Sequence, residues 1–291
     1  MDCKGRLKTI IGSKMQRRLA HYYYALSHRD KMVTAIKKIS ENKKFCNIHR
    51  GERCFILGND PSLKEISLQT LKDEWVFTVN YFNKLEDYKA VKTNYHVWAD
   101  PAFFNMNDAM HFDMKEVMEC YEAISNENCE CFVPMYAYEF FEKQGLLEKL
   151  KPNLLYADGN LEKRIETDIC NTVTAYTNVV QYALTVAIYM GFSEIYLLGC
   201  DSTYIMGVFD NLLQINNHDL HAYGNDNAKK GMEEMLKYYS MSDIMKGQYL
   251  LFLGYEKLYK YCEEKGIKLY NCSNRTVVTS IPRIALEIVL S

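Results

Sequence analysis

The chain has 291 residues and a formal net charge of -2, and 48% of its residues are hydrophobic. This length and hydrophobic content suffice for one large α/β domain with a full core, and they exclude an intrinsically disordered chain. The balanced charge lacks the basic face of a nucleic-acid-binding protein, so no nucleic-acid partner is expected.

The first 50 residues form a basic segment in which lysine and arginine alternate with apolar and aromatic residues at helical spacing. Two interpretations stay open: residues 1–45 make peripheral contact with an anionic membrane surface, or the helix packs across the domain or against another subunit of a homo-oligomer. The segment lacks the apolar core of a secretory signal, and no run in the chain approaches the roughly 20 apolar residues of a transmembrane helix. We therefore expect a cytoplasmic protein, either free or at the inner face of the cytoplasmic membrane.

Strand-like and helix-like segments alternate along the rest of the chain. Apolar runs predict strands at 51–59, 75–82, 94–100, 129–135, 193–201 and 268–273. Helices are predicted at 139–150, 176–192, 229–265 and 281–290. The clearest strand and helix pair is the uncharged helix at 176–192 with the buried strand after it, and a polar segment from about 202 to 228 follows that strand.

This order predicts an α/β fold with a single Rossmann-like, mostly parallel, doubly wound sheet. We divide the chain into a basic helical extension at 1–50 and a catalytic domain at 51–291, with a helical lid at about 202–250. The predicted strands end in polar residues: Asn59, Asn80, Asp100, Asp201 and Ser273. Because the carboxyl ends of parallel strands meet at one edge of a sheet, these five residues favour a ligand site there.

The stretch GNDPSL interrupts the chain after the first predicted strand. Gly58 can adopt backbone angles that other residues avoid, Asn59 and Asp60 tolerate turns, and the Ser62 hydroxyl is placed to cap a following helix. Such a loop presents backbone N–H groups to phosphates or sugar hydroxyls. A plain turn is the alternative, because the loop lacks the several glycines of a dinucleotide fingerprint or a P-loop.

The ten cysteines are scattered along the chain, and Cys120, Cys129 and Cys131 lack the second pair and the histidine of a zinc site. We predict reduced thiols, in keeping with a cytoplasmic protein.

Three segments carry a resemblance to a known group of proteins. FILGNDPSLKEI at 55–66, TVAIYMGFSEIYLLGCD at 185–201 and NNHDLHAYGND at 216–226 together resemble the bacterial lipooligosaccharide sialyltransferases and the related superfamily of motility-associated factors and hydroxymethylpterin pyrophosphokinase-like proteins. The likeness spans roughly residues 51–290 and leaves the basic extension outside. It implies a GT-A-variant-like catalytic domain.

The resemblance implies roles for individual residues. Gly58, Asn59, Ser62 and Asn80 would contact a cytidine nucleotide. Asp201 and the segment after it, Ser202, Thr203 and Tyr204, would face the donor, with the Tyr204 hydroxyl on its phosphate. Asp60, Asp100 and Ser273 complete the predicted donor-binding set. His221, or His218 beside it, would act as the general base on an acceptor hydroxyl, a reaction that suits an imidazole near neutral pH.

Three functions follow as hypotheses. The first is a metal-independent glycosyltransferase without cofactor, which passes a sialic acid or a related nonulosonate from a CMP-linked nucleotide-sugar donor to a hydroxyl of a glycan acceptor, in lipopolysaccharide or other surface-glycan biosynthesis. The second is pyrophosphoryl transfer from ATP to a pterin, in which Asp100, Asp201 and Asp219 would supply carboxylates for magnesium. The third is a nucleotide-binding protein without catalysis.

Overall fold

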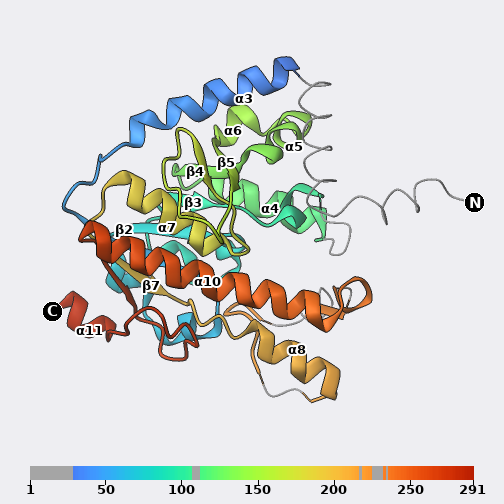
Figure 1. Ribbon diagram of the computed structural model, residues 1–291, viewed down its shortest axis with the longest axis vertical. Helices are drawn as coiled ribbons and strands as arrows, with labels where there is room; N and C mark the ends of the chain where they lie inside the picture. Colours follow the sequence, from blue (N-terminus) through green and yellow to red (C-terminus); the bar gives the residue numbers. More distant parts are fainter. Residues whose placement is uncertain (1–28, 107–111, 216–217, 225–231, 234) are drawn as a thin grey trace, which may run out of the picture.

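The computed structural model of the protein describes residues 29–106, 112–215, 218–224, 232–233 and 235–291 (Figure 1). The strands are β1 (Arg53–Leu57), β2 (Trp75–Val79), β3 (Tyr95–Val97), β4 (Glu130–Pro134), β5 (Asn153–Gly159), β6 (Thr172–Thr174), β7 (Glu194–Leu198) and β8 (Lys268–Asn271). The α-helices are α3 (Arg29–Glu41), α4 (Met114–Ser125), α5 (Tyr138–Lys143), α6 (Leu147–Leu150), α7 (Val179–Met190), α8 (Tyr204–Leu213), α10 (Met241–Lys265) and α11 (Leu286–Leu290). Short 3-10 helices are η1 (Asn42–Phe45), η2 (Pro61–Glu65), η3 (Leu68–Leu71), η4 (Phe82–Lys84), η5 (Tyr88–Ala90), η6 (Pro101–Phe104) and η7 (Met135–Ala137).

The described strands form one eight-stranded sheet in the order β6-β5-β4-β3-β2-β1-β7-β8. Every neighbouring pair is parallel, so the predicted α/β fold with a mostly parallel sheet is confirmed. From β1 the chain proceeds outward to β6, returns through α7, and adds β7 on the other side of β1. The direction of winding therefore reverses between β1 and β7, and ligands of such sheets bind near this reversal, outside the carboxyl ends of the strands.

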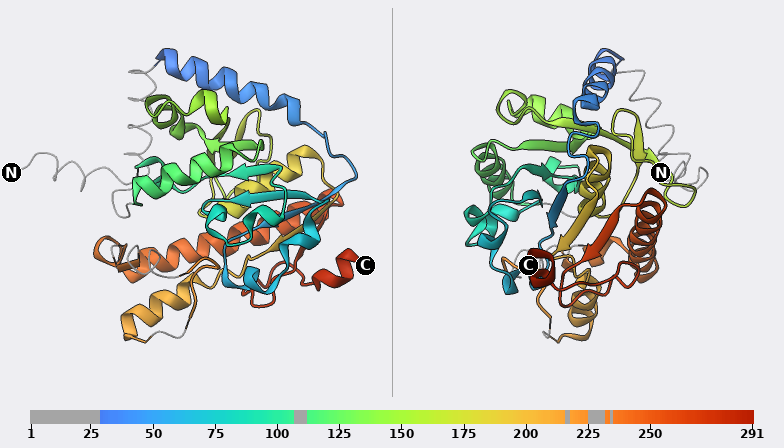
Figure 2. Two further views of the ribbon diagram at one scale, coloured as in Figure 1. Left: turned by 180° about the vertical axis from the view of Figure 1, so that it is seen from behind. Right: turned by 90° about the vertical axis from the view of Figure 1, so that its left-hand side faces the viewer.

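Helices cover both faces of the sheet, as the right-hand view of Figure 2 shows. Successive side chains of a strand point to opposite faces, so Cys54 and Ile56 of β1 pack toward α7 and α10. Phe55 and Leu57 pack on the other side, against the segments after β1 and β2 and against α11. A further cluster on that side joins α4, α5 and α6 to β4, β5 and Trp98, the residue after β3.

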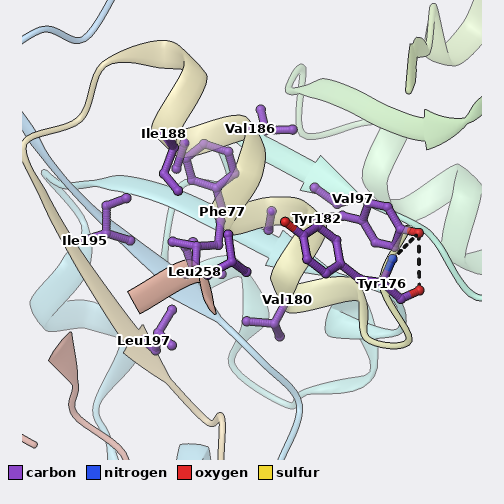
Figure 3. Packing of buried hydrophobic residues seen from close by; sticks show 14 of the residues in the cluster. Phe77, Val97, Tyr176, Val180, Tyr182, Val186, Ile188, Ile195, Leu197 and Leu258 are labelled. Atoms are coloured by element: carbon purple, nitrogen blue, oxygen red, sulfur yellow. Dashed lines mark hydrogen bonds between the residues drawn. The ribbon is translucent and has the colours of Figure 1, made fainter. Parts of the chain in front are cut away.

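Helix α7 lies at the centre of the larger core, as Figure 3 shows. Its side chains Val180, Val186 and Ile188 belong to the same buried cluster as Phe77 and Ile195 of the sheet. The Asn178 side chain caps the helix by accepting a hydrogen bond from the Val180 N–H at 2.8 Å, and Gly191 ends it with a φ of 88°. The uncharged sequence thus forms a buried helix that brings the chain back to β7.

The carboxyl half of the predicted basic extension packs on the sheet. Ile39 is buried beside α4 and α5, and the Asn42 amide donates to the carbonyl oxygens of Leu154 and Ile169, both at 2.8 Å. Phe45 contacts Phe132 of β4 with ring centroids 5.1 Å apart. Over residues 39–45 the packing interpretation is therefore the one observed, while residues 1–28 lie outside the described residues.

Three expected segments differ from the structure, and two strands were missed. The segment after GNDPSL forms η2 and η3 instead of one helix, and the polar segment after β7 contains α8. The last helix is shorter than 281–290, because a backbone bridge between Asn271 and Arg283 keeps its first residues extended. Strands β5 and β6 were not predicted. Within the expected lid, residues 216–217, 225–231 and 234 lie outside the described residues.

Candidate functional site

The loops after β1 and β7 are bound to each other by backbone hydrogen bonds. The N–H of Gly58 donates to the carbonyl oxygen of Leu198 at 2.7 Å, and the N–H of Asp60 donates to that of Gly199 at 3.0 Å. Gly58 does not have a positive φ, whereas Gly199 has a φ of 60°. The expectation that Gly58 supplies unusual backbone angles is therefore wrong; its value is the absence of a Cβ where two backbones touch.

Side chains reinforce this junction. The Asp201 carboxylate accepts hydrogen bonds from the Ser62 N–H at 2.9 Å and from the Ser62 hydroxyl. The Asp60 carboxylate accepts from the Ser202 N–H at 2.8 Å, and the Ser273 hydroxyl accepts from the Cys200 N–H at 2.9 Å. The Ser62 hydroxyl therefore does not cap a helix, because it donates its hydrogen bond to a buried carboxylate 139 residues away. These polar groups hold the strand ends together, and their predicted contacts with a donor stay predictions.

A second group of residues lies at the ends of β1 and β2. We define the strand-end cluster as Asn59, Asn80, Tyr81, His221 and Tyr223. The Asn59 amide donates to the carbonyl oxygen of Val79 at 2.9 Å, directly before Asn80. The Ala222 N–H donates to the Asn59 carbonyl oxygen at 2.8 Å, which draws the loop at 218–224 over the end of β1. Tyr223 stacks on His221 with ring centroids 5.0 Å apart and meets Tyr81 edge-on at 6.3 Å.

Four polar atoms of the strand-end cluster are buried and have no hydrogen-bond partner within the described part of the chain. They are the side-chain oxygens of Asn59, Asn80 and Tyr81 and the Nδ1 atom of His221. Buried polar groups in folded proteins almost always have a hydrogen-bond partner, because a buried group without one costs about 1–3 kcal/mol. Their concentration in one cluster at the carboxyl ends of parallel strands indicates a ligand site.

Asp100 lies next to this cluster and is surrounded by tyrosines. Its carboxylate caps η6 by accepting from the Ala102 N–H at 2.9 Å, and burial raises its pKa. The Asp100 charge in turn contributes to the raised pKa values of four nearby tyrosine hydroxyls, which are mainly raised by burial: Tyr81, Tyr136, Tyr204 and Tyr223. For Tyr204 the pKa is raised to about 12. All four phenols are therefore protonated hydrogen-bond donors at neutral pH.

The two predicted histidines occupy different environments. His218 is held at the end of α8, where its Nδ1 atom lies 2.8 Å from the Asp210 carboxylate and its backbone N–H donates to the same oxygen at 2.9 Å. His221 belongs to the strand-end cluster. Burial lowers the pKa of His221 to about 4, a hydrogen bond with the Asn59 backbone opposes this, and the positive charge of Lys84 adds to it. His221 is thus a neutral imidazole at neutral pH.

Several residues of this site were not predicted from the sequence. Tyr81 directly follows the predicted Asn80, and Tyr223 comes two residues after the predicted His221, so the sequence offered a signal for both. Tyr136, which donates to the Ala99 carbonyl oxygen at 2.8 Å, and Lys84 follow β4 and β2 in the same way. Thr203, which was predicted, is half-buried at the start of α8.

Asp60 is expected to make the stability of the protein depend on pH. Burial raises its pKa from 3.8 to about 7, the Ser202 N–H opposes this, and the Asp201 carboxylate adds to it. Between about pH 4 and pH 7 the folded protein therefore holds a proton that the unfolded chain has lost, so this group makes stability fall as pH rises through that window. Urea unfolding at pH 5 and pH 8 tests this. We expect the free energy of unfolding of Asp60→Asn, relative to that of the wild type, to be higher at pH 8 than at pH 5. Asp73→Asn, which alters a carboxylate that is 87% exposed, is the matched control. An equal difference between Asp60→Asn and the wild type at both pH values would contradict the assignment.

The described residues contain no group of three or more His, Cys, Asp or Glu side chains placed to hold a metal ion, so Asp100, Asp201 and Asp219 are not gathered into one cluster. The nine cysteines within the described ranges are free thiols. None of the described helices is both long and apolar enough to span a bilayer.

Comparisons with known proteins were made for the whole chain. No family model matches it, and no curated protein sequence matches it. Among solved structures it is similar to the Campylobacter jejuni sialyltransferase CstII in complex with a substrate analogue, cytidine-5'-monophosphate, with 19% identity, a TM-score of 0.39, and coverage of 80% of this chain and 85% of that one. It is also similar to the MAf glycosyltransferase of Magnetospirillum magneticum AMB-1, with 11% identity and a TM-score of 0.41. That match covers 89% of this chain but 38% of the other. Neither is a pterin pyrophosphokinase, and they lend that part of the resemblance no support.

Proposed function

We propose that the protein is a glycosyltransferase that moves a sialic acid or a related nonulosonate from a CMP-linked donor to a hydroxyl of a bacterial surface glycan. The observation that carries the proposal is the strand-end cluster, in which four buried polar atoms at the carboxyl ends of parallel strands lack hydrogen-bond partners among the described residues. The motif resemblance supplies the class of ligand, and the parallel sheet supplies the place where such ligands bind.

The donor would lie along the ends of β1 and β2. The side-chain amides of Asn59 and Asn80 offer the hydrogen bonds that a pyrimidine or ribose needs. Tyr204, whose pKa of about 12 keeps it protonated, would donate to the phosphate. Ser62 and Asp201 act indirectly in this scheme, because their bonds to each other hold the loop that carries Asn59.

The transfer would be a direct displacement at the anomeric carbon. The acceptor oxygen forms a bond to this carbon, the bond from the carbon to the phosphate oxygen breaks, and CMP departs with the electron pair. His221 would take the proton of the acceptor hydroxyl. Its low pKa keeps it unprotonated before binding, and the negative charge of a bound donor would raise that pKa toward the working pH. Protonated tyrosines can stabilise the departing phosphate, so the proposal includes no metal.

A thermal-unfolding screen with CMP, CDP, UDP, GDP and ATP, each with and without magnesium, tests the donor class. We expect CMP at 100 times its Kd to stabilise the folded protein by about 2.7 kcal/mol without magnesium. Release of CMP from a CMP-linked nonulosonate in the presence of a glycan acceptor would then demonstrate transfer. Stabilisation by ATP with magnesium alone would contradict the proposal and favour pyrophosphoryl transfer. A UDP or GDP response would retain glycosyl transfer with a different donor.

A further inference from the structure

Lys84 lies beside the strand-end cluster and has no role in the scheme above. It ends η4, the short helix after β2, and its side chain is 24% exposed. The Lys84 Nζ atom lies 4.1 Å from the centre of the Tyr81 ring and 5.8 Å from that of Tyr223. Its ion pair with Glu116 of α4, at 2.6 Å, fixes the ammonium group on one side.

The surroundings of Lys84 show that its charge acts on the candidate site. The same charge that lowers the pKa of His221 also opposes the effect of burial on the pKa of Cys120. The Lys84 side chain is 24% exposed and its ammonium lies over two tyrosine rings. Partial removal from solvent strengthens the attraction of a cation for an anion. An ammonium group has three N–H donors, so the ion pair with Glu116 leaves donors for a ligand.

A second observation points to a ligand at the same place. The Tyr81 hydroxyl is buried and has no partner within the described residues, although the Lys84 ammonium lies over its ring. Carboxyl groups otherwise dominate this region, because the charges of Asp60, Asp100 and Glu116 contribute to the raised pKa of neighbouring tyrosines. An anionic ligand would need a compensating cation here.

We propose that Lys84, together with the Tyr81 hydroxyl, forms the subsite that binds an anionic oxygen group of the ligand, either the nucleotide phosphate or a sugar carboxylate. The ligand's identity rests on the proposed function, and the anion subsite itself does not. Lys84 thereby selects acidic over neutral ligands, and Glu116 positions its ammonium group.

Titration calorimetry with cytidine, CMP and a CMP-linked nonulosonate at fixed ionic strength tests this subsite. We expect Lys84→Met to raise the Kd of an anionic ligand by about 10- to 100-fold, the usual effect of losing a charge-assisted hydrogen bond. Cytidine should bind the variant as it binds the wild type. If Lys84→Met binds both CMP and the CMP-linked nonulosonate more weakly, Lys84 binds the phosphate. If it binds only the CMP-linked nonulosonate more weakly, Lys84 binds the sugar carboxylate. Lys268→Met, which removes a 2.7 Å ion pair with Glu194 at the start of β8, is the matched control.

Unchanged affinity of Lys84→Met for both anionic ligands would overturn the subsite, and so would an equal loss for cytidine. If Lys84→Met does not fold, Glu116→Gln provides the test, because an unneutralised Lys84 should bind CMP more tightly; equal or weaker binding would overturn the proposal.

If the wild type binds none of the three ligands, the proposed function fails while the subsite is still testable. Inorganic pyrophosphate should then protect the wild type from thermal unfolding and not protect Lys84→Met. Equal protection of the two proteins, or none, would overturn the subsite as well.

Discussion

His221→Ala is expected to lower the rate of sugar transfer by about 100- to 10,000-fold, the usual effect of removing a general base. Nucleotide affinity should stay within a few-fold of the wild type, because Asn59 and Asn80 remain in place. The measurements are the rate of CMP release with acceptor present and the Kd for CMP. Because the pKa of His221 is lowered to about 4, protonation should reduce kcat/KM only toward pH 4 and leave the range from pH 6 to 8 unaffected by this group.

His218→Ala is the matched comparison, since it removes the other predicted histidine. His218 interacts with Asp210 near the end of α8, and it is not among the buried side chains that lack a hydrogen-bond partner within the described part of the chain. We expect it to retain most of the transfer rate. A large loss in His218→Ala with a normal rate in His221→Ala would reverse the assignment. Loss of nucleotide binding in His221→Ala would instead give His221 a binding role.

The main strands could be predicted because their signal is local. The strands β1, β2, β4 and β7 are mostly apolar after their first residue, which is typical of strands buried on both faces. The missed strand β5 reads NLLYADG and is paired through contacts with β4 that no local pattern encodes, such as Phe132 beside Asn153. β6 has three residues, too few for any period to appear.

The candidate site shows the same division between local and distant causes. The polar residues that follow the strands could be predicted, and Asn59 and Asn80 do lie near one another, because the Asn59 amide donates to the Val79 carbonyl oxygen. The role of Ser62 could not be predicted, because its partner Asp201 follows β7, on the other side of the point where the winding of the sheet reverses. Tyr223 enters the site because the Ala222 N–H bonds to the Asn59 carbonyl oxygen, a contact between segments about 160 residues apart in sequence.

Gly58→Ala is expected to lower the free energy of unfolding by about 3 kcal/mol, the upper part of the range for overpacking a rigid interior. A Cβ at this position would overlap the Gly199 carbonyl oxygen and lie 3.0 Å from the Cys200 sulfur. A backbone carbonyl cannot move aside as a flexible side chain can, so β1 and β7 would have to separate at their carboxyl ends. Asn59, and with it the proposed nucleotide contact, would move too.

Urea unfolding measures the Gly58→Ala effect, and Gly247→Ala is its control. Gly247 lies inside α10, and a Cβ there would meet nothing within 4 Å. Alanine in a helix interior is more stable than glycine by about 0.5–1 kcal/mol, so this variant should gain stability. Opposite signs for the two glycine substitutions would show that the close approach of two backbones, and not glycine itself, governs position 58. A Gly58→Ala protein as stable as the wild type would mean that the two loops do not touch, and the junction that supports the strand-end cluster would have to be abandoned.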